Sequence, residues 1–365
     1  MRSSFLSLCC LALLVALLPA CSSMPSASPE PAHFKVSEGA EGRRFRTADD
    51  LTLFGQWWTP SGPVKAVVLL LHGTGVHSGF YNTWTNELSA NGYAVFGIDL
   101  RGWGQSQGFG IRGYVNSYDE YVDDAYLAYR EIRFRYPNKQ VYIEGDSLGA
   151  DVALLAAITN RIPATGLILQ APALKPNPAL GGFHVGSFSV VTAAALAAAD
   201  PTAAVFPMSM FAKLAFSDPE VRQRFLDDPL CVHASLPAAY LIAMENASDR
   251  ILEHAADVKQ PVLVLHGGED NLVPLDSSEL LMKRLGSDDK VIHVYDKLSH
   301  ELMHDTGHEE VWTDIIHWLD GRVVLANAAQ AKADADAAAA AAAPPPLAIP
   351  APAQTDAAAV PAAAP

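Results

Sequence analysis

The feature that most constrains the fold is the run Gly145–Gly149, which has the pattern G-x-S-x-G. It directly follows the β-rich stretch Val141–Ile143 and leads into an apolar helical pattern. A serine at such a strand-to-helix turn presents its hydroxyl at the end of the strand, and the crowded turn demands small residues on both sides. The two glycines meet this demand, so the pattern predicts that Ser147 is a nucleophile.

Short β-rich apolar runs alternate with helical patterns, which is typical of a mostly parallel sheet flanked by helices. We expect an antiparallel hairpin in Arg44–Trp58 before this region. The expected strands are Val67–Leu71, Tyr93–Ile98, Val141–Ile143, Gly166–Leu169, Val262–Leu265 and Val291–Tyr295. The expected helices are Tyr81–Asn91, Ser117–Tyr136, Leu148–Asn160, Ser277–Leu285 and His308–Leu319. The sequence thus predicts an α/β domain whose core has two parts, residues 41–172 and 260–325.

The interval between these parts, residues 173–259, breaks the alternation. It contains the uncharged stretch Ser187–Ala199, which is rich in Ala, Ser and Thr and too weakly hydrophobic for a membrane span. We therefore predict an inserted helical cap. Its large apolar side chains, Phe206, Met210 and Phe211, are candidates for lining a pocket for an apolar substrate.

The N-terminus has the features of an export signal. Residues 1–20 combine Arg2 with a short apolar stretch, which indicates a signal peptide that is removed. The following cysteine, Cys21, ends a tetrapeptide that resembles the lipobox of bacterial lipoproteins; ordinary signal-peptidase cleavage is the alternative. We expect Cys21 to be lipidated, residues 21–40 to form a tether, and the protein to be anchored, by resemblance, in the bacterial outer membrane. The Ser, Pro and Ala content of the first part of this stretch suits a flexible segment.

Composition limits the remaining choices. The chain of 365 residues is 50% hydrophobic and 18% charged, which is enough for one large core. Its net charge of −15 argues against nucleic-acid binding, which needs clustered Lys and Arg. Residues 326–365 are nearly all Ala and Pro and are predicted to be disordered. Cys231, the one thiol left by export and lipidation, is interpreted as a small buried hydrophobe.

A serine nucleophile needs a histidine to accept its proton and a carboxylate to orient that histidine. The loop after the strand Val262–Leu265 contains Asp270, the predicted acid, and Glu269 is the rival. The loop after the last strand contains His300, the predicted base. His304 and His293 are the competing histidines, interpreted as a solvated helix residue and a satisfied strand residue.

The oxyanion of an acyl-transfer intermediate requires preorganised donors. The backbone N–H of Leu148, the residue after the nucleophile, is one predicted donor. The other is the backbone N–H of Thr74, which lies between two glycines in the loop after Val67–Leu71 and whose side chain is not required. A phosphate-binding loop is the alternative, but the P-loop lysine and the dinucleotide glycine spacing are missing. No metal or organic cofactor is predicted.

Two runs, His72–Tyr81 and Asp99–Ser106, resemble the monoacylglycerol lipase and lysophospholipase group of the α/β hydrolases. The resemblance covers about Arg44 to Leu319 and implies the α/β-hydrolase fold with a cap. It places the nucleophile, acid, base and oxyanion donors on the residues already named. This chain departs from the group at Asp146, where histidine is usual, and at Ala150, where glycine is frequent.

The resemblance implies a serine hydrolase that cleaves carboxylic esters of apolar acyl groups through an acyl-enzyme on Ser147. Monoacylglycerol or lysophospholipid is the expected substrate. A short-chain carboxylesterase is the alternative within enzymes. A non-catalytic, membrane-tethered lipid carrier is the alternative from another class, and the complete set of catalytic residues argues against it.

Overall fold

The computed structural model describes residues 25–174 and 199–342. The chain divides into two units, of which the first ends at Asp320 and the second begins at Gly321. Cys21 and the stretch Ser187–Ala198 lie outside the described residues, so the predictions made for them remain predictions.

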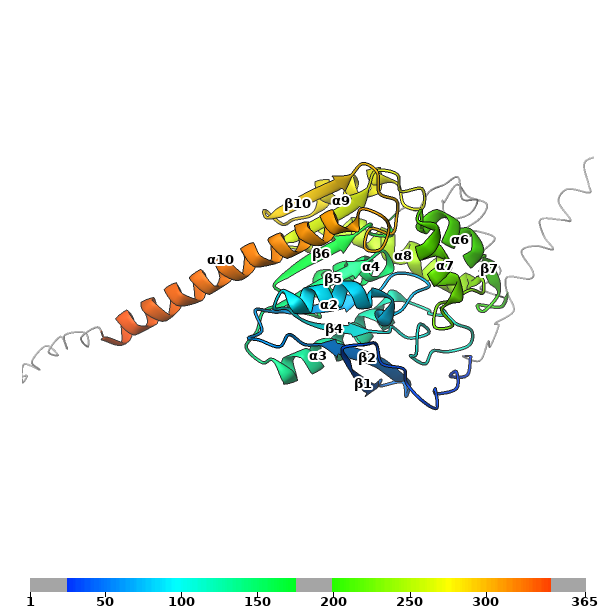
Figure 1. Ribbon diagram of the computed structural model, residues 1–365, viewed down its shortest axis with the longest axis horizontal. Coiled ribbons are helices and arrows are strands. Elements are labelled where there is room, and N and C mark those ends of the chain that lie inside the picture. The colour runs from blue at the N-terminus through cyan, green and yellow to red at the C-terminus, as the bar shows by residue number, and fades with distance from the viewer. Residues whose placement is uncertain (1–24, 175–198, 343–365) are drawn as a thin grey trace, which may run out of the picture. The chain divides into compact units, whose positions relative to one another are not determined.

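An eight-stranded sheet forms the centre of the first unit (Figure 1). Its spatial order is β1-β2-β4-β3-β5-β6-β9-β10. The first two strands form the predicted hairpin and pair antiparallel with the rest, whereas all strands from β4 to β10 in this order are parallel. The strands are β1 Ala40–Arg46, β2 Thr52–Trp58, β3 Val67–Leu71, β4 Ala94–Ile98, β5 Val141–Asp146, β6 Gly166–Gln170, β9 Val262–Gly267 and β10 Lys290–Tyr295. All the predicted strands are therefore confirmed.

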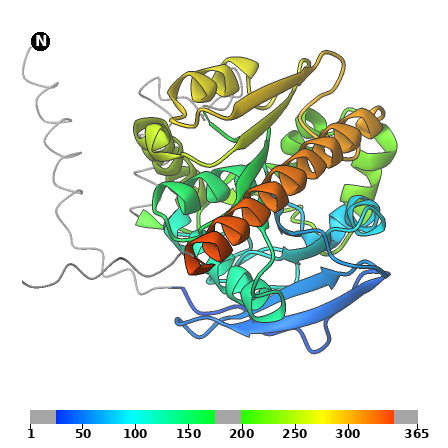
Figure 2. The same cartoon turned by 90° about the vertical axis from the view of Figure 1, so that its left-hand side faces the viewer.

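Helices cover both faces of the sheet (Figure 2). The helices of the core are α2 Asn82–Ala90, α3 Tyr118–Arg135, α4 Leu148–Ile158, α9 Leu275–Arg284 and α10 His308–Ala342. Helix α2 meets the first part of α10 through Trp84 and Trp312, whose rings lie 5.3 Å apart. Helices α3 and α4 pack against each other. The central strands β3 to β6 are buried along their whole length, as expected for parallel strands covered on both faces.

The cap lies between β6 and β9, as predicted. Its described elements are the short paired strands β7 Ala204–Phe206 and β8 Leu236–Pro237 and the helices α6 Met208–Ala215, α7 Pro219–Asp227 and α8 Ala238–His254, which is followed by the 3₁₀ turn Ala255–Asp257. Backbone bonds join the cap to the core at two places near the candidate site. Val232 N–H donates to Gly75 O at 2.8 Å, and Glu301 N–H donates to Ala215 O at 3.0 Å. The cap is thus attached next to both the loop after β3 and the loop after β10.

The segment before β1 differs from the predicted flexible tether. From residue 25 on it is hydrogen-bonded to the first unit: Ser28 N–H donates to Gly108 O at 2.7 Å, and Gly110 N–H donates to Ser26 O at 2.9 Å. The side chain of Gln105 bonds both the N–H and the carbonyl of Lys35. A Ser/Pro/Ala-rich segment has few large side chains to pack. Its backbone N–H and carbonyl groups can still form hydrogen bonds with glutamine side chains and with the backbone of the first unit.

The C-terminal part of α10 differs from the predicted disorder, because the helix continues through residues 326–342. Alanine has the highest helix propensity, and this stretch contains no proline until residue 344. Local propensity is sufficient here, although Val324 and Leu325 are largely exposed and provide no apolar face for burial.

Candidate active site

The predicted nucleophile lies at the turn from β5 to α4. Ser147 has φ +49° and ψ −107°, a strained conformation for a residue with a side chain. A Cβ at Gly145 would collide with the Gly149 carbonyl, and one at Gly149 would collide with the Leu71 carbonyl of β3. Both glycines of the pattern are therefore required by close packing, and this packing holds the serine at the end of the strand.

The predicted acid lies in the loop after β9. One oxygen of Asp270, Oδ1, accepts the backbone N–H groups of Leu272 and Val273, each at 2.8 Å. The other, Oδ2, lies 2.8 Å from Nδ1 of His300. Burial alone would raise the pKa of the Asp270 carboxyl. The charge of His300 and its hydrogen bond lower this pKa by more, so the net effect is a lowered pKa. The rival Glu269 is exposed and makes no bond to this histidine.

The predicted base, His300, is 2% exposed and lies in the loop after β10. Because Nδ1 donates to Asp270, the lone pair of the neutral ring is on Nε2, which is buried and has no hydrogen-bond partner among the described residues. Burial lowers its pKa, but Asp270, Asp146 and Glu301 raise it, to about 9. When His300 is neutral, its lone pair therefore lies on Nε2, which is the tautomer that a general base for the serine requires.

The two competing histidines have other partners. His304 is buried, with Nε2 bonded to Phe80 O at 3.0 Å and Nδ1 bonded to Glu301 at 2.7 Å. The interpretation of His304 as a solvated helix residue is therefore wrong, because this histidine is buried against the η1 turn, Ser78–Tyr81. His293 bonds Asp314 at 2.7 Å, in agreement with a satisfied strand residue.

The predicted oxyanion donors border the nucleophile. The backbone N–H groups of Thr74 and Leu148 donate to no described residue, and both residues are buried. The loop that contains Thr74 is fixed at the preceding residue, because Gly73 N–H donates to Tyr81 Oη at 3.0 Å. Two free N–H groups beside Ser147 are what an oxyanion hole requires.

A buried acidic cluster beside the nucleophile was not predicted. The hydroxyl of Tyr81 donates to Asp146 at 2.5 Å, and Glu301 lies close enough to affect the titration of Asp146. Burial, followed by the charge of Glu301, raises the pKa of Asp146 to about 7, and burial raises that of Glu301 to about 7. The departure from histidine at position 146 was the one sequence signal of this cluster.

A narrow apolar pocket opens beside Ser147. Of the predicted cap residues, Phe206 and Phe211 line it, whereas Met210 does not and is half-buried elsewhere. Met208 is buried instead, and its Cε lies 2.5 Å from the position of a Cβ on Gly75. The sequence missed the other lining residues, which are Ala173, Leu236, Tyr240, Met244, Leu272 and Val273.

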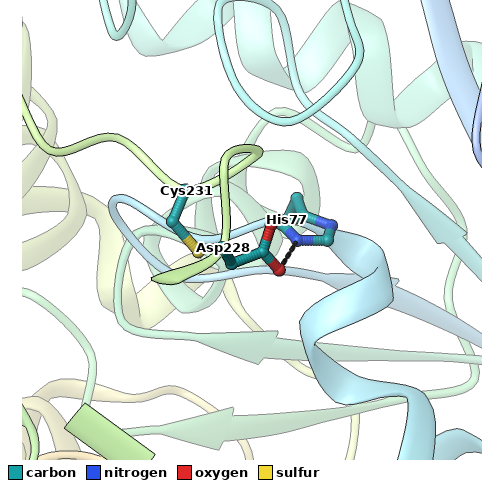
Figure 3. Close-up of side chains that lie close together, drawn as sticks. All are labelled: His77, Asp228 and Cys231. Atoms are coloured by element: carbon teal, nitrogen blue, oxygen red, sulfur yellow. Dashed lines mark hydrogen bonds and ion pairs between the residues drawn. The ribbon is translucent and has the colours of Figure 1, made fainter. Parts of the chain in front are cut away.

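One group of described residues has three metal-ligating side chains close together (Figure 3): His77, Asp228 and Cys231, whose ligand atoms lie within 4.8 Å of one another. Nδ1 of His77 accepts the Gly79 N–H, so Nε2 has the proton and donates to Asp228 at 3.0 Å. Burial raises the pKa of the Cys231 thiol. Metal binding would require the loss of the proton on His77 Nε2 and of the Cys231 thiol proton. The observed hydrogen bond between His77 and Asp228 is therefore interpreted as a link between the cap and the loop after β3.

Comparison with known proteins identifies the family. The model of a family described as serine aminopeptidase, S33, matches residues 62–307, which is more than half of the chain. The chain belongs to this family. Among curated proteins, this S33 chain is 28% identical to the monoacylglycerol lipase of Mycolicibacterium smegmatis, over 72% of the chain and 90% of that protein. It is 29% identical to human monoglyceride lipase, over 77% of the chain and 91% of that protein.

Solved structures agree with the fold of this S33 chain. The monoacylglycerol lipase of Paleococcus ferrophilus has a TM-score of 0.65 and 27% identity, over 74% of this chain and 99% of that one. A soluble variant of the Saccharomyces cerevisiae monoglyceride lipase has a TM-score of 0.67 and 20% identity, over 81% and 99%. The predicted α/β-hydrolase fold is thereby confirmed.

Proposed function

We propose that this protein is a serine hydrolase that cleaves carboxylic esters of apolar acyl groups, with monoacylglycerol as the substrate. The observation that supports this most directly is the position of Ser147 at an apolar pocket, beside free backbone donors and an Asp270–His300 pair. The names of its relatives, monoacylglycerol and monoglyceride lipases, support the choice of substrate.

The proposed reaction has two halves. His300 Nε2 takes the proton of Ser147 as its oxygen attacks the ester carbonyl, and the oxyanion is stabilised by the N–H groups of Thr74 and Leu148. Collapse of the intermediate breaks the bond to the alcohol, which leaves with the proton from His300. Water then attacks the acyl-enzyme by the same route, and the fatty acid and free Ser147 result.

The apolar pocket also favours ester cleavage over the aminopeptidase activity after which the family is named. An aminopeptidase must bind the ammonium group of its substrate, which favours a carboxylate in the pocket. Among the described residues that line the pocket, the polar side chains are the hydroxyls of Thr74, Ser147 and Tyr240. Neutral lining of this kind suits an acyl chain.

A panel of substrates tests the proposal. Purified protein is assayed on monoacylglycerols, lysophospholipids, short-chain esters and aminoacyl amides, with Ser147→Ala as the control. We expect the highest kcat/KM on a long-chain monoacylglycerol and no turnover by the variant. Labelling by a fluorophosphonate probe should likewise depend on Ser147. Turnover by the variant would disprove the nucleophile, and preference for short acyl chains would favour a short-chain carboxylesterase.

We further propose that the protein is an exported lipoprotein held to the bacterial outer membrane through Cys21. The support is the signal-like sequence before this cysteine. Within the described residues, no helix is long and apolar enough to span a membrane. Cys21→Ser, expressed in a bacterial host, should lose the lipid mass from the N-terminal peptide and leave the membrane fraction. Unchanged fractionation with no lipid on the native peptide would contradict the anchor.

A further inference from the structure

The side chain of Thr74 has a specific partner in the cap. Its Oγ1 lies 2.6 Å from Oη of Tyr240, which belongs to α8. Both residues are buried, and both line the apolar pocket together with Ser147. A residue chosen for its backbone N–H therefore also places a hydroxyl at the wall of the reaction site.

The direction of this hydrogen bond follows from the surroundings. Either oxygen can donate, but a buried phenol proton left without an acceptor costs about 1–3 kcal/mol. The neighbouring Tyr118 hydroxyl is buried, and the group with which it interacts is the Tyr240 hydroxyl, so its proton needs the Tyr240 oxygen as acceptor. The Thr74 proton, in contrast, is at the pocket wall, where a bound substrate can accept it. Tyr240 is therefore the donor, and the Thr74 proton is left for the pocket.

We propose that the Thr74 hydroxyl is a third donor to the oxyanion, and that Tyr240 of the cap holds it in position. Thr74 then contributes two donors from one residue, its backbone N–H and its side-chain O–H. Full negative charge on the substrate oxygen exists only after Ser147 has attacked, so this bond strengthens in the transition state and acts on kcat.

The proposal rests on the proposed ester hydrolysis and adds a role for the cap. Tyr240 is a positioning residue, because it contacts the reacting oxygen only through Thr74. Tyr240 lies in the cap, whereas Thr74 lies in the core. The third donor is consequently oriented only while α8 is in the described position.

Two matched variants test the role of the hydroxyl. Thr74→Val replaces the hydroxyl by a methyl group of similar size and retains the backbone N–H. We expect kcat to fall about 100-fold with KM little changed. Thr74→Ser retains the hydroxyl and should restore most of kcat. Ser147→Ala, assayed in parallel, shows whether hydrolysis itself depends on the nucleophile, so failure of the proposed function is recognised separately.

A double variant distinguishes catalysis from mere support of the tyrosine. Thr74→Val removes the acceptor of the Tyr240 proton, and Thr74→Val combined with Tyr240→Phe removes that defect. If the hydroxyl acts on the oxyanion, the double variant remains as slow as Thr74→Val, and a trifluoromethyl ketone that forms an oxyanion binds both more weakly. Recovery of kcat in the double variant, or a kcat of Thr74→Val within threefold of Thr74→Ser, would overturn the proposal.

Discussion

Tyr81 donates a hydrogen bond of 2.5 Å to Asp146, the residue immediately before the nucleophile. The same tyrosine oxygen accepts the N–H of Gly73 at 3.0 Å, in the loop that contains Thr74. The nucleophile turn and the oxyanion loop are thus joined through one buried phenol. The charge of Asp146 also raises the pKa of His300, so this contact links the geometry of the site to its titration.

The first prediction concerns pH. His300 must be neutral to accept a proton, and its pKa is raised to about 9, so kcat/KM should rise as the pH increases towards this value. Asp146→Asn keeps an oxygen for Tyr81 but removes a negative charge that favours the imidazolium. The pKa of His300 should fall, and the kcat/KM profile should move to lower pH. Tyr81→Phe keeps the carboxyl group but removes a hydrogen bond that lowers the pKa of Asp146, so it should move the profile in the same direction by a smaller amount. A profile of Asp146→Asn that superimposes on that of the wild type would contradict the electrostatic role.

The second prediction concerns the acid. Asp270→Asn removes the charge that orients and stabilises the His300 imidazolium, and kcat should fall by about 10³–10⁴-fold. His300→Ala should be more severe, because no base remains. Glu269→Gln is the matched control, since Glu269 is exposed, and its kcat should remain near that of the wild type. The reverse order of the two carboxylate variants in steady-state kinetics would show that the acid is Glu269.

The third prediction concerns stability. Asp124 and Arg101 form a buried pair with two bonds, of 2.6 and 2.9 Å, and side chains that are 0% and 5% exposed. Asp124→Ala leaves the guanidinium without its main partner and should lower the free energy of unfolding by about 3–5 kcal/mol. The adjacent Asp123 is 62% exposed and pairs with Arg161, so Asp123→Ala should cost at most about 1 kcal/mol. Equal effects of the two variants in urea denaturation would refute the burial argument.

The fourth prediction concerns the C-terminal residues. Deletion beyond Ala326 should leave the melting temperature and kcat essentially unchanged, because the side chains of Val324 and Leu325 are already 66% and 61% exposed at the end of the buried part of α10. Circular dichroism should show a loss of helical signal equal to the deleted turns. A lower melting temperature would mean that the deleted residues stabilise the folded core.

The sequence was sufficient for features that depend on local pattern. The run Gly145–Gly149 is diagnostic because the two glycines are forced by backbone contacts that recur wherever this turn forms. Asp270 and His300 were found because each follows a strand of a parallel sheet, and such ends meet at one edge. The partner of Asp146 could not be predicted, because Tyr81 reaches it from a separate loop.

The cap shows where pattern is insufficient. Met210 was proposed for the pocket on hydrophobicity alone, but the buried positions of α6 are Met208, Phe211, Ala212 and Ala215. These follow the three- and four-residue spacing of one helix face, and residue 210 lies off that face. Tyr240 was missed because the sequence of α8 does not indicate which of its side chains will contact the loop after β3.

The bonded N-terminal segment has a consequence for where an anchored form could work. Pro25 already packs near Gly110, and three residues separate it from Cys21. Fully extended, the four steps from Cys21 to Pro25 span about 14 Å, roughly half the hydrocarbon thickness of a bilayer. An enzyme lipidated at Cys21 would therefore keep its folded part close to the surface of its own membrane, meet lipids by lateral diffusion in two dimensions, and leave those of any opposing membrane untouched.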